Sequence, residues 1–301
     1  MTTVSCSLSA GVLAAAAQPL AQMASAVSDV SATLVPTRLH SVAPSPAFWA
    51  AISFYVVATA LLLAVLGGQK RMRQLALGIV VAAFVMHGVD IGWRGTQGVH
   101  PAQSVREALG FLGFIVAGGY LLASLRYRLT LGGAVVMPIA LVLLLAARLS
   151  PTGTNPAGLS VLGRVHISLA TIGIAVFALA SVLSAMYLTQ DRAMKRKRFD
   201  TMSSADAPLD GLDRLAHRLI WFGFPVFTLA LALGTWWTAE LRRSFLRLEN
   251  LAAVVTWAAF AGVLVMRAVY GWRGRRSAKL TLLGFGAGLL VLALYLLRRV
   301  W

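Results

Sequence analysis

His87, Asp90 and Arg94 are three ionisable residues close together in an otherwise apolar stretch. Their spacing of three and then four residues places them on one face of an α-helix. Ionisable side chains are costly in apolar surroundings, so they are candidates for proton transfer, ion pairing or ligand binding. Asp90 has two alternative roles, because it can orient the His87 imidazole or pair with Arg94. A third interpretation is a structural polar cluster at a helix end.

His166 is a second candidate, just after the Pro- and Gly-rich segment 150–163 and at the expected start of a helix. A neutral imidazole in this position can coordinate a metal ion or a haem iron. A lone histidine at a helix start is also a common interfacial residue. His40 and His100 lie in polar surroundings and are weaker candidates, and we interpret His217, beside Arg214 and Arg218, as an interfacial residue.

Aromatic and basic residues gather between two later apolar runs, with Trp236 and Trp237 followed by Arg242 and Arg243. In segment 239–249 the apolar and basic residues separate onto different helical faces, as expected for an amphipathic helix on a membrane surface. One interpretation is an aromatic belt with flanking arginines. The other is a platform whose rings stack on a flat macrocycle while its guanidinium groups bind two propionates.

The composition of the 301-residue chain excludes a soluble fold. Hydrophobic residues make up 58% of the sequence and charged residues 12%, with a mean hydropathy of +0.78, whereas soluble domains carry about 25% charged residues. The net charge of +17 comes from short basic runs between apolar segments, which is typical of membrane topology rather than of nucleic-acid binding. Cys6 is the single cysteine, which excludes an intramolecular disulfide.

Apolar runs long enough to cross a bilayer, about 20 residues each, predict the elements that position these side chains. We expect an all-α, polytopic membrane protein with about eight transmembrane helices. The expected spans are residues 48–68, 75–93, 107–125, 129–147, 165–188, 219–238, 250–269 and 280–297.

Lysine and arginine counts predict the orientation of these spans. Alternate loops on one side carry 16 of these residues, and the termini and remaining loops carry 10. The positive-inside rule then places both termini outside a plasma or inner membrane. Four parts follow: an outward tail (1–46), a five-helix front part (47–189), a basic cytoplasmic linker (190–218) and a three-helix back part (219–301) with an outer loop at 239–249.

Several segments resemble, in order and spacing, the cytochrome c assembly family, and most closely its CcsA, ResC and HemX-like branch. The histidine-led helix and basic tail at 164–198 begin GRVHISLATIG, and the stretch 212–234 reads LDRLAHRLIWFGFPVFTLALALG. The similarity continues through Thr256 and Trp257 and through GWRGRRSA at 271–278. Near the front, it includes His87 and the REALGF run at 106–111.

The resemblance implies haem handling for cytochrome c maturation at the outer membrane face. His166 corresponds to an outer axial ligand and His87 to a histidine inside the membrane, both toward haem iron only. Trp236, Trp237 and Trp257 border the region of the family's Trp-rich loop. The cofactor would be b-type haem, with Asp90, Arg94 and Glu107 as supporting residues. Expected partners are membrane lipid, a CcsB-type or other maturation membrane protein, and an apocytochrome c.

The chain also departs from the family pattern. It lacks the WxWDPKE-like run, and no histidine stands near Val265 or in the C-terminal LYLLRRVW, where two further family histidines would fall. Because no catalytic acid–base constellation is evident, we expect haem binding or relay rather than enzymatic activity. The alternatives are a HemX-like regulator or scaffold that uses linker 190–218 as its partner surface and, least favoured, a proton-coupled transporter that uses His87 and Asp90.

Overall fold

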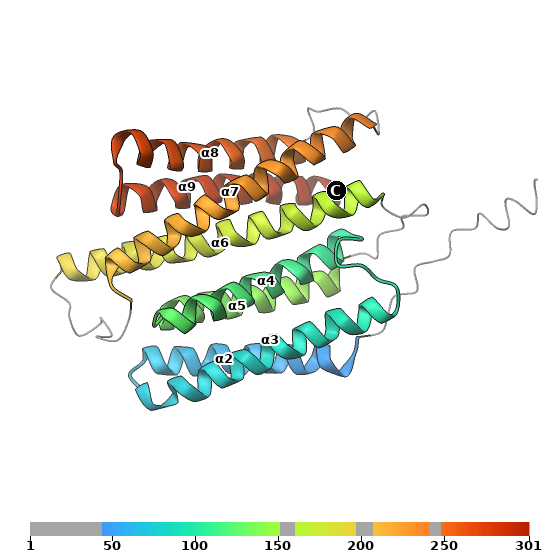
Figure 1. Cartoon of the computed structure of the whole chain (residues 1–301). Coiled ribbons are helices and arrows are strands. Elements are labelled where there is room, and N and C mark those ends of the chain that lie inside the picture. Colours follow the sequence, from blue (N-terminus) through green and yellow to red (C-terminus); the bar gives the residue numbers. More distant parts are fainter. Residues whose placement is uncertain (1–43, 151–159, 197–206, 241–247, 301) are drawn as a thin grey trace, which may run out of the picture. The chain divides into compact units, whose positions relative to one another are not determined.

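The computed structural model describes residues 44–150, 160–196, 207–240 and 248–300. This part of the chain folds into α-helices joined by short connections and one 3₁₀ turn, η1 (Lys70–Met72) (Figure 1). The helices are α2 (Pro46–Leu66), α3 (Arg73–Thr96), α4 (Val105–Arg126), α5 (Thr130–Leu149), α6 (Val161–Lys195), α7 (Leu209–Glu240), α8 (Leu248–Tyr270) and α9 (Arg275–Val300).

The predicted all-helical membrane fold is confirmed. Each expected span coincides with one of the eight helices in the described ranges. Seven of them, α2 to α8, have the length and the apolar composition needed to cross a membrane. The outward placement of the termini stays a prediction, as does the division into four parts. Residues 1–43 of the predicted tail and 241–247 of the predicted outer loop lie outside the described residues.

Helix α7 begins ten residues before the expected span at 219. Its first turns carry charges that lower the local hydropathy, yet they are packed against the protein. Leu212 is 1% exposed, and Asp213 pairs with Arg267 of α8. Helical structure therefore extends into both ends of the predicted linker 190–218, whose residues 197–206 lie outside the described part of the chain.

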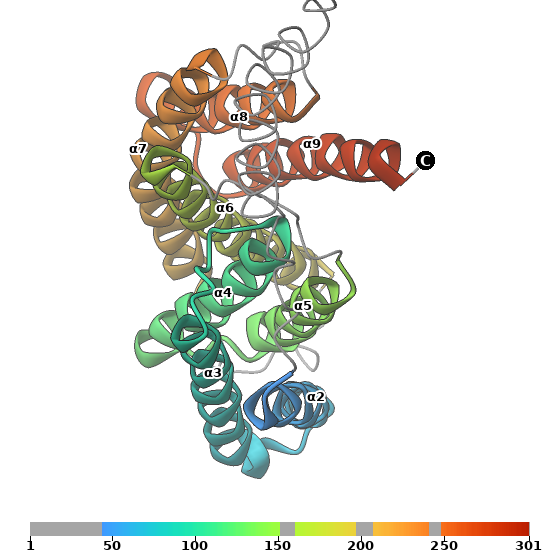
Figure 2. The ribbon, with the colours of Figure 1, turned by 90° about the vertical axis from the view of Figure 1, so that its right-hand side faces the viewer.

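The helices pack in a continuous series, as the end-on view in Figure 2 shows. Helix α2 packs against α3 and α5, and α4 packs against α5 and α6. Helix α6 in turn contacts α7 and α9, which continue to α8. One apolar cluster fills the space among the earlier helices, and a second joins α6, α7 and α8. In the second cluster Phe177 stacks on Phe260, with ring centroids 3.7 Å apart.

Successive helices run in opposite directions (Figure 1), so alternate helix ends meet at the same end of the series. We call the end where α4 begins the Glu107 end, and the end where α7 begins the Asp213 end. Serines cap three helices at the Glu107 end: the Oγ atoms of Ser45, Ser104 and Ser160 accept backbone N–H bonds in the first turns of α2, α4 and α6. These caps fix where the helices carrying His166 and Glu107 start.

Candidate functional site

His166, in the first turns of α6, has its imidazole fixed by the neighbouring helix α7. Its Nδ1 atom lies 2.7 Å from the carbonyl oxygen of Ala230. A carbonyl oxygen only accepts hydrogen bonds, so Nδ1 carries the proton and donates it. In the neutral ring, Nε2 then holds a lone pair. A histidine that binds a metal has this form, because a backbone acceptor at the other nitrogen fixes its tautomer and orientation.

The His166 ring reaches α7 because residue 234 has no side chain. A Cβ atom at Gly234 would lie 2.5 Å from Cε1 and 2.8 Å from Nδ1 of His166. Contacts this short do not occur between real atoms of these kinds, so the ring would have to move. Gly234 therefore belongs to the site, because the absence of a side chain there leaves room for the imidazole.

Trp237 lies beside His166 on the α7 side. The two ring centroids are 5.9 Å apart and the rings are tilted by 46°. The preceding Trp236 is 64% exposed. The structure thus brings one predicted tryptophan into contact with the predicted ligand and leaves the other at the surface. Arg242 and Arg243 lie outside the described residues.

His87 is fully buried between α2, α3 and α4. Its Nδ1 atom is 3.1 Å from the hydroxyl of Tyr55, and its ring also meets Phe114 edge-on at 5.7 Å. Nε2 has no hydrogen-bond partner among the residues that the structure describes. A tyrosine hydroxyl can donate or accept, so either tautomer satisfies Nδ1. Nε2 holds a lone pair for a ligand only in the tautomer whose Nδ1 carries the proton and donates it to the Tyr55 oxygen.

Asp90 pairs with Arg94 rather than with His87. Arg94 Nε donates to Asp90 Oδ2 at 3.2 Å, and the other Asp90 oxygen accepts from Ser45 Oγ at 2.6 Å. Arg94 Nη1 also donates to both oxygens of Glu107, at 2.8 and 3.0 Å. This network joins the start of α2, the end of α3 and the start of α4. Of the two roles predicted for Asp90, the ion pair is the one present, and Tyr55 orients His87.

Arg106 stands out beside this network because its charge is buried. It is 6% exposed, and its Nε and Nη2 atoms find no hydrogen-bond partner in the described ranges. Its closest carboxylate contact is Glu107 Oε1, at 4.0 Å from Nε. Arg106 lines a small pocket together with His87 and Arg148.

The two predicted histidine ligands do not meet. His87 belongs to the packing of α3 with α2 and α4, whereas His166 belongs to that of α6 with α7. His100, at the same end, has the opposite tautomer from His166. Its Nδ1 accepts the N–H of Ala102 at 3.0 Å, which leaves the proton on Nε2 in the neutral ring. His166 therefore differs from His100 in chemistry as well as in position.

Trp257 has a partner for its polar atom inside the protein. Its indole Nε1 donates to Thr228 Oγ1 at 2.9 Å, and its ring tilts over Phe224 at 5.6 Å. These contacts join α7 and α8. Contact of Trp257 with a cofactor stays a prediction.

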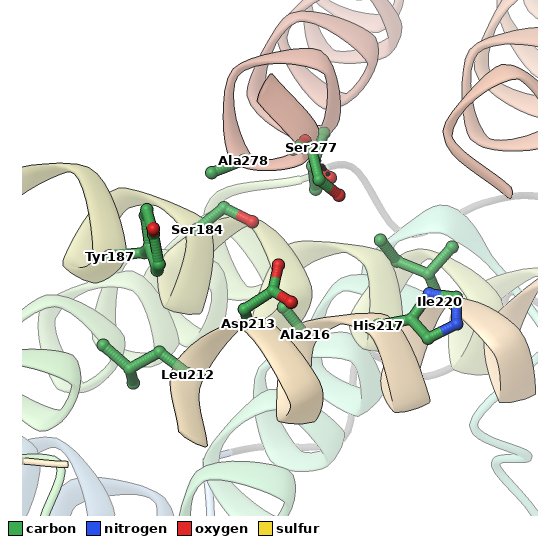
Figure 3. A pocket seen from close by; sticks show the side chains of 10 residues that line it. Ser184, Tyr187, Leu212, Asp213, Ala216, His217, Ile220, Ser277 and Ala278 are labelled. Atoms are coloured by element: carbon green, nitrogen blue, oxygen red, sulfur yellow. Dashed lines mark hydrogen bonds between the residues drawn. The ribbon is translucent and has the colours of Figure 1, made fainter. Parts of the chain in front are cut away.

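A polar pocket lies at the Asp213 end, between α6, α7 and α9. Figure 3 shows Asp213 and His217 on α7, Ser184 and Tyr187 on α6, and Ser277 on α9 around it. His217 Nδ1 is buried and has no partner among the described residues. His217 was expected to be an interfacial residue, and this pocket was not predicted from the sequence.

Asp213 is held at that pocket by three hydrogen bonds. Arg267 of α8 donates to its two carboxylate oxygens at 3.1 and 2.9 Å, and the backbone N–H of Gly274 donates to Oδ1 at 2.9 Å. The carboxylate therefore connects the start of α7 to the end of α8 and to the turn before α9. Within the described ranges, no group of three His, Cys, Asp or Glu side chains is placed to hold a metal ion.

Comparison with known proteins decides the family. The model of the cytochrome c assembly protein family matches residues 45–301. The chain belongs to this family. Among its relatives, the cytochrome c biogenesis protein CcsA of Guillardia theta is 28% identical over 243 residues, which cover 72% of this chain and 80% of that protein. The CcsA protein of Synechococcus elongatus is 26% identical over 260 residues, 69% of this chain and 80% of its own length.

The chain is also similar to a protein that is not named CcsA. Protein HemX of Brevibacillus brevis is 26% identical over 179 residues, 57% of this chain and 65% of that protein. No solved structure matches the chain significantly. Family membership and the seven apolar helices together make the chain a multi-pass membrane protein of the cytochrome c assembly family.

Proposed function

We propose that this member of the cytochrome c assembly family binds haem at the Glu107 end, with Nε2 of His166 as an axial ligand to the iron. The observation that carries the proposal is the Nδ1 hydrogen bond to Ala230, since it leaves the lone pair on the nitrogen that ligates iron. Gly234 and Trp237 support it by giving the ring space and an aromatic neighbour.

The other predicted residues have subordinate roles in this proposal. Trp236 and Trp237 supply aromatic surface to the macrocycle, while Arg242 and Arg243 pair with a propionate. His87 provides a second imidazole inside the membrane, because its Nε2 is without a described partner. Bound haem supplies an iron centre for axial ligation, and hydrophobic burial of the ring supplies much of the affinity.

We place the haem at the outer face of a plasma or inner membrane, where the count of basic residues puts the Glu107 end. The family is one of cytochrome c assembly, and the CcsA relatives are named for cytochrome c biogenesis. By extension, the partners are a CcsB-type membrane protein and an apocytochrome c. Because the WxWDPKE-like run and two family histidines are absent, the role is delivery or relay rather than synthesis of the covalent bond.

The experiment is haem content after expression with ample haem and purification in detergent. We expect His166→Ala to lose most of its haem, while His100→Ala, at the same end but in the other tautomer, keeps it. Helical content by circular dichroism controls for folding. Equal haem content in the two variants would refute His166 as the ligand.

A second candidate is a regulator or scaffold of haem metabolism, favoured by the match to protein HemX. In that case the basic stretch 195–198, in linker 190–218, recruits a partner protein and the histidines do not ligate haem. Neutralising these four charges would then abolish partner capture, and the protein would be colourless with or without His166. A haem spectrum that depends on His166 would reject this candidate.

A further inference from the structure

A second ligand site is indicated by the buried guanidinium group of Arg106. Its side chain is 7% exposed, yet Nε and Nη2 have no hydrogen-bond partner among the described residues. Buried N–H groups without an acceptor are costly, so proteins rarely keep them unless a ligand, an ion or water accepts their hydrogen bonds. Arg106 lines the pocket at the Glu107 end formed by α2, α3, α4 and α5.

The carboxylates of this pocket are already in use. Asp90 is bound by Ser45 and Arg94, and Glu107 is bound through both oxygens by Arg94. Arg94 thus binds both carboxylates through hydrogen bonds, and Arg106 keeps only a longer ion pair with Glu107, at 4.0 Å from its Nε.

Arg148, near the end of α5, adds a further positive charge to the same pocket. No ion pair between described residues includes it. Three arginines therefore face two carboxylates, which leaves the pocket one positive charge in excess when His87 is neutral. One monovalent anion would balance this charge.

We propose that Arg106 and Arg148 bind one carboxylate group in this pocket. A guanidinium group donates two parallel hydrogen bonds to a carboxylate, so the unpaired Nε and Nη2 of Arg106 match this group in number and arrangement. The pocket has room only for a group of a few atoms. A single negative charge also fits the excess of one better than a phosphate, which carries close to two charges at neutral pH.

A haem propionate and a small free carboxylic acid both present this group. Only the propionate source rests on the proposed function, since it requires that the protein bind haem. The free acid does not, and the two sources are separable by experiment. Arg148→Gln is the variant of choice, because Arg148 is only half-buried whereas Arg106 is buried, so its loss should disturb the fold less. Arg164→Gln is the matched control, as Arg164 is exposed at the same end of the structure.

The first arm measures the thermal stability of the detergent-purified full chain in sodium acetate against sodium chloride of equal ionic strength. The second arm compares the affinity for haem with that for haem dimethyl ester, in which both propionates are blocked. For a free acid, acetate raises the melting temperature of the wild type and the control by a few degrees but not that of Arg148→Gln. For a propionate, Arg148→Gln weakens haem binding about tenfold, as expected for a charge-assisted bond, and leaves ester binding unchanged.

Either response supports the carboxylate site and identifies its source. Arg148→Gln behaving like Arg164→Gln in both arms would overturn the inference. Failure of the proposed function is a separate result, since a chain that binds no haem can still show the acetate response.

Discussion

The Nδ1 atom of His166 lies 2.7 Å from the carbonyl oxygen of Ala230, so α7 determines the tautomer and orientation of an imidazole that α6 carries. The donor and acceptor are 64 residues apart in the chain. The arrangement depends on how closely two helices approach, and a change on α7 should therefore alter the ligand on α6.

Gly234→Ala should weaken haem binding by about tenfold or more, the effect expected when an axial ligand loses the group that orients it. The added methyl group would overlap the His166 ring and push it away from Ala230. The measurement is a haem titration followed by absorption. Gly262→Ala in α8 is the control, because nothing lies within 4 Å of a Cβ atom there. Equal affinities for the two variants would contradict the role of Gly234.

Tyr55→Phe should destabilise the protein by about 1–3 kcal/mol, the usual cost of leaving a buried polar atom without its partner. The change removes the only described hydrogen bond of His87 Nδ1, in a ring that is fully buried. Thermal or denaturant unfolding in detergent measures the effect. Tyr270→Phe serves as the comparison, since Tyr270 is 66% exposed. If both substitutions lower the free energy of unfolding equally, the hydrogen bond between Tyr55 and His87 does not stabilise the fold.

Asp213→Asn should lower the unfolding free energy by about 2 kcal/mol, because Arg267 loses a charged partner at a site where both side chains are 13% exposed. The comparison is Lys195→Gln, which breaks the pair with Asp191. Lys195 is 58% exposed, so its pair should contribute only about 0–0.5 kcal/mol. Comparable losses in melting temperature would show that the Asp213 end is not held by this pair.

The eight spans were predictable because a bilayer requires about 20 apolar residues in a row, a signal that is local in sequence. The relation of Asp90 to Arg94 was also local, since residues four apart on a helix are neighbours. Helix α7 begins ten residues before the predicted span. Asp213 and its neighbours lower the local hydropathy, and the sequence does not show that Asp213 pairs with Arg267 of α8.

The hydrogen-bond partners of His87 and His166 could not be predicted from neighbouring residues in the sequence. His87 is held by Tyr55, 32 residues away, and His166 by a backbone carbonyl, which every residue possesses. Residue type and position made both histidines candidates, and the resemblance to the family gave them roles toward haem, but neither the tautomer of His166 nor the need for Gly234 follows from residue types. The missing hydrogen bonds of Arg106 likewise depend on Arg94 binding both nearby carboxylates, which is a result of three-helix packing.

The most direct test of the central claim is rescue of His166→Gly by imidazole, followed by absorption spectra in the oxidised and reduced states. If Nε2 of His166 ligates the iron, the wild type shows a Soret band with α and β bands, the variant loses them, and added imidazole restores them. The cavity left by the side chain lies next to the Ala230 carbonyl, which can accept the N–H of the added ring. A variant whose spectrum equals that of the wild type before imidazole is added would contradict the account.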